Sequence, residues 1–61
     1  MNKGKLSDTQ RRRWRSLYNA GWRVVLDSEY GLYVVKDSSG QVRSSPESER
    51  YLAVRELVGR D

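Results

Sequence analysis

The chain has 61 residues with no cysteine and no histidine, which excludes disulfides and leaves a zinc site without its usual ligands. Residues 1–23 hold seven basic groups against one acid and residues 24–61 hold five against seven, so the net charge of +4 divides into +6 and −2. A chain this short buries only about 60% of the surface that it exposes when unfolded, so we expect one domain over residues 1–61, stabilised by aliphatic and aromatic packing.

The first predicted element is an amphipathic helix from about residue 8 to 20, preceded by a flexible basic tail over residues 1–6. Ser7 is a typical N-cap, and Gln10 three residues later completes a capping box. Gly21 follows as a C-terminal stop. The apolar side of this helix consists of Trp14, Leu17 and Tyr18.

Three strands are predicted next, over residues 22–26, 32–36 and 41–44. The short turns between them, at 28–31 and 37–40, allow only antiparallel hairpins and therefore a meander. Alternation predicts a core face made of Trp22, Val24, Leu26, Leu32, Val34 and Val42. The outer face then consists of Arg23, Val25, Tyr33, Val35, Gln41 and Arg43, and a one-residue shift in either strand would reverse this assignment.

A second helix is predicted from Pro46 to about Val58, with Ser45 as its N-cap and Gly59 as its stop. The expected fold is therefore α+β, in the order α-β-β-β-α, with a three-stranded antiparallel meander and two helices packed on one face. The predicted core comprises Trp14, Leu17, Tyr18, Trp22, Val24, Leu26, Leu32, Val34, Val42, Tyr51, Val54, Leu57 and Val58.

Enzymatic chemistry has few candidate groups in this chain. Without histidine or cysteine there is no imidazole base and no thiolate nucleophile. The acids of the second predicted helix lie beside arginines, which is typical of a solvated, ion-paired surface. We therefore expect no catalytic residue, no metal and no cofactor. No apolar run reaches the about 20 residues that span a bilayer, and no signal-peptide core is present, so a cytoplasmic protein without a membrane partner is expected.

The basic residues suggest an anionic partner. Arginine binds phosphate through two parallel hydrogen bonds and stays charged at physiological pH. The cluster in the first helix consists of Arg11, Arg12, Arg13 and Arg15. The outer sheet face adds a second candidate set, Arg23, Tyr33, Lys36 and Arg43, which suits either nucleic acid or a protein interface. A basic helix that only keeps the protein soluble remains an alternative, as does a homodimer through the outer sheet face.

The chain resembles two families of nucleic-acid-binding domains in part. The α-β-β-β-α order resembles that of double-stranded-RNA-binding domains, although residues 45–49, Ser-Pro-Glu-Ser-Glu, stand where that family has a lysine-rich helix start. The stretch 31–40, followed by a strand and a helix, is similar to the DNA-binding arms of tyrosine recombinases. That likeness implies DNA contacts from Tyr33, Lys36 and Arg43. Neither resemblance assigns the chain to a family.

The function expected from the sequence is non-enzymatic binding of nucleic acid through the basic first helix. The alternative is a regulator or inhibitor that docks on an acidic surface of a partner protein. Phage-encoded inhibitors of host machinery include chains of similar size.

Overall fold

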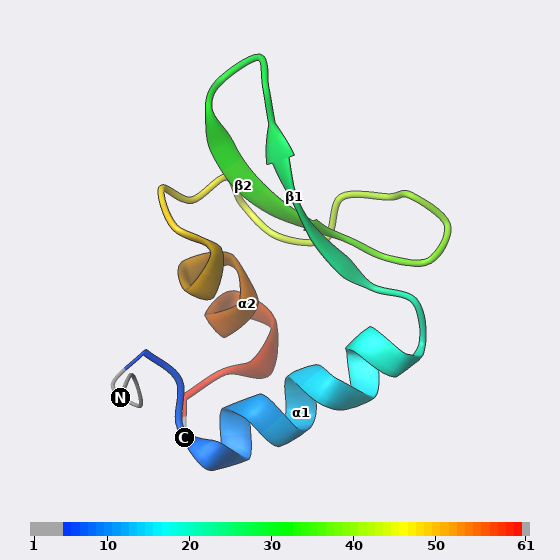
Figure 1. Ribbon diagram of the computed structural model, residues 1–61, viewed down its shortest axis with the longest axis vertical. Coiled ribbons are helices and arrows are strands. Elements are labelled where there is room, and N and C mark those ends of the chain that lie inside the picture. The colour runs from blue at the N-terminus through cyan, green and yellow to red at the C-terminus, as the bar shows by residue number, and fades with distance from the viewer. Residues whose placement is uncertain (1–4, 61) are drawn as a thin grey trace.

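The computed structural model describes residues 5–60, and over this range the order of elements is α-β-β-α (Figure 1). The elements are helix α1 (Asp8–Asn19), strands β1 (Arg23–Asp27) and β2 (Leu32–Lys36), and helix α2 (Arg50–Val58). The strands form one antiparallel hairpin. The α+β class is thus confirmed.

Helix α1 begins and ends as its sequence predicts. The Ser7 hydroxyl accepts the Gln10 N–H at 3.0 Å, and Gln10 Oε1 accepts the Ser7 N–H at 2.8 Å, which completes the capping box. After the helix, Gly21 adopts a φ of +105°, and a Cβ at this position would lie 2.8 Å from the Ser38 Cβ. Glycine is therefore required at this position, where the chain leaves α1 and lies against Ser38 of the 37–40 loop.

The register of the hairpin differs from the predicted one by one residue. Asp27 pairs with Leu32 across the 28–31 loop, so Val24 lies opposite Val35. Val35 is fully buried, and the prediction that it belongs to the outer face is wrong. The physical reason is the length of the loop. Four loop residues pair even-numbered residues of β1 with odd-numbered residues of β2, so Val35 shares a face with Val24.

The predicted third strand is not confirmed. The chain does follow the free edge of β2, but only through isolated bridges that join Tyr33 to Glu47 and Lys36 to Val42. Between them the Ser44 hydroxyl, rather than a backbone carbonyl, accepts the Val35 N–H at 2.9 Å. A side chain therefore interrupts the ladder, and residues 42–47 form an irregular edge instead of a regular strand.

Helix α2 begins at Arg50 rather than at Pro46. Glu47 donates its N–H to the Tyr33 carbonyl at 2.9 Å and accepts the Tyr33 N–H at 2.7 Å. The backbone groups that a helix start at Pro46 would use are therefore committed to β2. Ser45 does not act as the N-cap; Glu49 occupies that position without a side-chain cap bond.

The two helices do not lie side by side on the sheet as predicted. Helix α2 contacts both strands, while α1 packs chiefly on α2, so that α2 lies between the hairpin and α1 (Figure 1). The main cluster of buried side chains joins β2 to α2 and consists of Val35, Ala53, Val54 and Val58, while the predicted core residue Val34 is buried apart from this cluster. The side chains packed against it are Leu6, Trp14, Trp22, Val24 and Leu57.

Three predicted core residues are exposed: Tyr18, Leu26 and Val42 are 47%, 54% and 49% accessible. Leu26 lies one residue from the tip end of β1, Val42 lies in the segment that bridges Lys36, and Tyr18 is the last residue but one of α1. The predicted flexible tail ends earlier than residue 6, since Leu6 packs against the core. Residues 1–4 of that tail lie outside the described residues. Over residues 5–60 no helix is long and apolar enough to cross a membrane.

The observed register makes a direct prediction about stability. Val35→Ala removes two methyl groups from a fully buried site and should lower the free energy of unfolding by about 2–3 kcal/mol. Val42→Ala removes the same groups from a half-exposed site and should change it by less than about 0.5 kcal/mol. Urea denaturation of both variants checks this. A larger loss for Val42→Ala would contradict the register.

Candidate nucleic-acid interface

The outward side of α1 carries three exposed arginines, Arg11, Arg12 and Arg15, which we name the basic face. Arg11 Nη2 contacts Asp8 Oδ1 at 2.9 Å, an exposed ion pair within the helix. Arg12 and Arg15 form no ion pair and donate no side-chain hydrogen bond among residues 5–60. Shallow depressions lie between these side chains, one of them lined by Asp8, Arg11, Arg12 and Arg15.

Arg13 serves the fold instead. Its Nη1 donates to the Val58 carbonyl at 2.7 Å, at the C-terminal end of α2. The last carbonyls of a helix lack intrahelical partners and carry the negative end of its dipole, so a guanidinium there is favourable. Of the four arginines in the predicted cluster, one is therefore turned toward α2 and three remain on the basic face.

Tyr18 and Arg23 extend the basic face past the end of α1. The Arg23 guanidinium lies 3.7 Å from the Tyr18 ring centroid, and its Nη1 donates to the Tyr18 carbonyl at 2.9 Å and the Trp22 carbonyl at 2.8 Å. Tyr18 also meets Trp14 edge-to-face, with ring centroids 6.2 Å apart. These contacts hold an exposed aromatic ring and a cation in fixed positions beside the helix.

The structure does not gather the residues predicted for the outer sheet face. Arg23 pairs with Lys36 and so shares a face with it, whereas Tyr33 pairs with Leu26 and lies on the opposite face. Arg43 lies in the irregular 42–47 segment, over the Trp22 ring at 5.2 Å. The predicted set therefore divides into separate locations.

A second group of cations and aromatic rings lies around the start of α2, and the sequence interpretation missed it. Arg50 lies over the Tyr33 ring at 5.2 Å. Lys5 and Arg55 lie over the Tyr51 ring at 5.4 and 5.5 Å. The helical spacing of Tyr51 and Arg55 was a readable signal for one of these contacts, but the approach of Lys5 was not. A hollow between these side chains is lined by Lys5, Tyr33, Ser48, Glu49, Arg50 and Tyr51.

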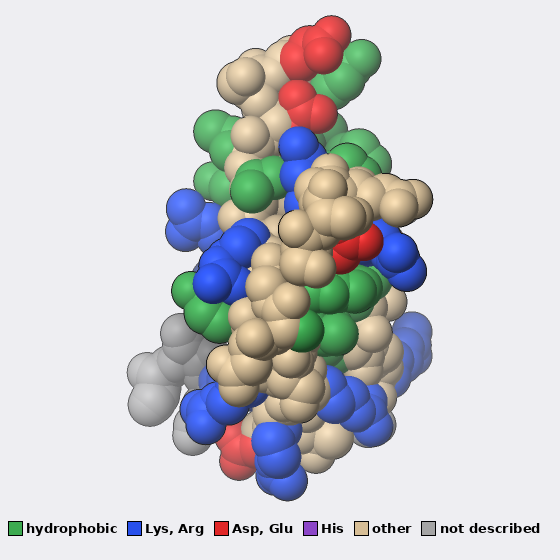
Figure 2. Space-filling model, turned by 90° about the vertical axis from the view of Figure 1, so that its right-hand side faces the viewer, with side chains coloured by type: hydrophobic (Ala, Val, Ile, Leu, Met, Phe, Trp, Pro, Cys, Tyr) green, Lys and Arg blue, Asp and Glu red, His purple; other side chains and the backbone are tan. Residues whose placement is uncertain are grey.

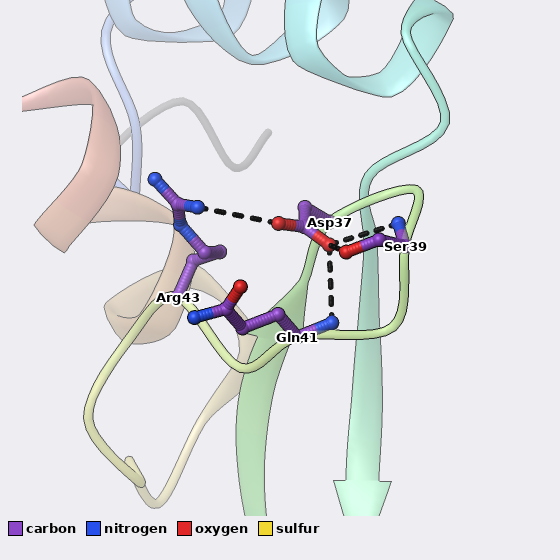
Figure 3. A network of polar contacts seen from close by, with 4 residues as sticks. All are labelled: Asp37, Ser39, Gln41 and Arg43. Carbon is purple, nitrogen blue, oxygen red and sulfur yellow. Dashed lines mark hydrogen bonds and ion pairs between the residues drawn. The ribbon is translucent and has the colours of Figure 1, made fainter.

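Asp37 organises the loop that holds Arg43 (Figure 3). Its Oδ1 accepts the Ser39 hydroxyl at 2.7 Å and the Ser39 and Gln41 N–H groups at 2.9 and 3.0 Å. Its Oδ2 pairs with Arg43 Nη1 at 3.3 Å. The Ser39 hydroxyl above all, then these N–H groups and the Arg43 charge, hold the pKa of Asp37 below its usual value.

Glu56 connects α2 to the segment before it, because its Oε1 accepts the Ser45 N–H at 3.0 Å. The neighbouring Glu56 carboxyl raises the pKa of Glu47, and the interaction with Glu47, aided by the Ser45 N–H, lowers the pKa of Glu56. Among the residues that the structure covers, no three acidic side chains come close enough together to hold a metal ion.

Comparison with known proteins finds no matching family model, no matching curated protein and no matching solved structure.

The Asp37 contacts predict how stability depends on pH. Because the pKa of Asp37 is lowered on folding, its contribution is present above the unfolded value of 3.8 and is lost as the pH falls through the folded value. Asp37→Asn should lower the thermal midpoint at pH 7. The midpoint of this variant should then fall less than that of the wild type when the pH is lowered. Circular dichroism melts at pH 7 and at about pH 3 measure both effects.

Asp8→Asn is the matched control, since it removes the same charge from a side chain that is 86% exposed. It should leave the midpoint at pH 7 nearly unchanged. Equal behaviour of the two variants would show that the Asp37 network does not stabilise the loop.

Proposed function

We propose that this protein is a small, non-enzymatic, cytoplasmic nucleic-acid-binding protein that docks the basic face of α1 on phosphate groups. The observation that carries the proposal is the exposure of Arg12 and Arg15 without an ion-pair partner among residues 5–60. Neither guanidinium has to leave an internal contact before it binds a phosphate. Binding at such a face gains from the release of counterions from the nucleic acid.

The distribution of charge supports this choice of surface. Figure 2 shows acidic side chains at the upper end of the molecule, where the hairpin ends, and several basic side chains over the lower end, around α1. The hairpin end contains Asp27 and Glu29. A polyanion is therefore attracted to the helical end and repelled from the opposite one, which orients the encounter.

The stacked pair of Tyr18 and Arg23 gives the proposal a specific extension. Tyr18 is 47% exposed, and Arg23 already covers it at 3.7 Å. Aromatic rings and guanidinium planes are the groups on which unpaired bases stack. A single strand that follows the basic face would meet this pair at the end of α1, which favours single-stranded segments or loops over a regular duplex.

The test is a titration of the protein against single-stranded and duplex oligonucleotides at several salt concentrations, followed by fluorescence anisotropy. We expect micromolar or tighter binding at low salt. Arg12→Ala combined with Arg15→Ala should weaken binding and reduce the slope of log K against log salt by about 2, since two phosphate contacts are removed.

Arg50→Ala combined with Arg55→Ala is the comparison variant, because it removes two charges from the second group of cations, on α2, and leaves the basic face of α1 intact. A general effect of net charge would change both double variants equally. The absence of binding at low salt would refute the proposal and favour an acidic protein partner, the alternative expected from the sequence.

A further inference from the structure

One edge of the hairpin has no partner. Strand β2 is paired on both sides, with β1 on one edge and with residues 42 and 47 on the other. Within residues 5–60 nothing pairs with the outer edge of β1. In Figure 1 β1 lies to the right of β2 in the upper part of the hairpin, and Figure 2, seen from that side, shows hydrophobic side chains exposed around the upper part of the molecule.

The contacts of β2 reveal which backbone groups of β1 point outward. Tyr33 and Val35 direct their N–H and C=O groups away from β1, since these bond Glu47, Arg43 and the Ser44 hydroxyl at 2.7–2.9 Å. Backbone groups alternate along a strand, so the residues paired with Tyr33 and Val35 also point away from the ladder between β1 and β2. Those residues are Leu26 and Val24.

We propose that the outer edge of β1 pairs with β1 of a second copy of this chain, antiparallel and about a twofold axis at Val25. In this register Val24 faces Leu26 of the second copy, and the outward N–H and C=O groups of both residues bond across the interface. The product is a continuous four-stranded antiparallel sheet made of two hairpins.

Charge complementarity selects this register. Strand β1 reads Arg-Val-Val-Leu-Asp, with opposite charges at its two ends. Pairing about Val25 places each Arg23 opposite Asp27 of the second copy, on the same face of the sheet, where opposite charges attract. Antiparallel pairings with the twofold axis at Val24 or at Leu26 also bond the outward N–H and C=O groups. The first places Arg23 opposite Val25 of the second copy, and the second places Asp27 opposite it.

The apolar residues of the strand support the same arrangement. Leu26 is 54% exposed although it lies on the face of the sheet that carries the core residue Val35. Pairing covers it with Val24 of the second copy and brings the two Val25 side chains together. Strand β1 contains no lysine or proline and pairs without a bulge, and its two charged residues, Arg23 and Asp27, stand at its ends.

Arg23 is held in place for this contact. Its Nη1 donates to the carbonyls of Tyr18 and Trp22, and its guanidinium is stacked on the Tyr18 ring. A guanidinium has five N–H donors, so Nη2 and Nε are still able to bind a carboxylate. The dimer does not depend on the proposed nucleic-acid function, because it forms without any other ligand.

Sedimentation equilibrium of the protein alone tests the proposal. The wild-type chain should approach twice its 7.1 kDa mass as its concentration rises. Arg23→Asp creates two Asp–Asp pairs in the interface, and Asp27→Arg creates two Arg–Arg pairs. Each variant by itself should therefore dimerise at least about tenfold more weakly than the wild type.

An equimolar mixture of Arg23→Asp and Asp27→Arg should dimerise again, because every facing pair is then of opposite charge. Arg55→Asp mixed with Glu49→Arg is the matched control: the net charges are the same, +2 and +6 from the wild-type +4, but the changes lie away from β1. Each control variant should dimerise like the wild type, alone or mixed.

Two results would overturn the proposal. One is a wild-type protein that stays monomeric up to about 1 mM, where even weak self-association is visible; the edge would then be left to a strand of another protein. The other is a mixture of the two β1 variants that fails to dimerise while circular dichroism shows both to be folded.

Discussion

The arrangement of this small domain depends on how α1 is attached to the end of α2. Gln10 is buried, and it completes the capping box of α1 while its Nε2 donates to the Gly59 carbonyl at 2.5 Å. Arg13, on the next turn, donates to the Val58 carbonyl at 2.7 Å. Two side chains of α1 therefore satisfy carbonyls at the C-terminal end of α2, where a helix has no partners of its own. These bonds fix both the position of α1 and its rotation about its axis.

That rotation decides what the surface can do. With Gln10 and Arg13 directed toward α2, Arg11, Arg12 and Arg15 lie on the basic face, and Tyr18 lies at its end beside Arg23. A helix turned by a quarter of a revolution would expose a different set. The same architecture leaves β1 with one edge unpaired among residues 5–60. The proposed anionic ligand uses the outward side of α1 and the proposed second copy uses the edge of β1, and Arg23 lies where these two surfaces meet.

Local sequence predicts the parts of this fold that local interactions determine. The capping box at Ser7 and the hairpin between residues 23 and 36 follow from neighbouring residues and are found in the structure. Two features depend on contacts outside their own elements and were missed: the Ser44 hydroxyl replaces a ladder bond, and Tyr33 bonds the backbone of Glu47 before α2 begins. The burial of Val35 was missed for a local reason, because the four-residue 28–31 loop sets the pairing of the two strands. Nothing in the sequence indicated that Arg13 has a different role from Arg11, Arg12 and Arg15, because its partner, the Val58 carbonyl, lies 45 residues away.

The most direct test of this account compares Arg13→Ala with Arg12→Ala in urea denaturation. The two changes remove the same side chain from adjacent positions of α1, and only Arg13 bonds a carbonyl of α2. Arg13→Ala should lower the free energy of unfolding by about 1–2 kcal/mol, as expected for a lost hydrogen bond from a charged group. Arg12→Ala should change it by less than about 0.5 kcal/mol. Equal losses, or a larger loss for Arg12→Ala, would show that α1 is not held in this rotation.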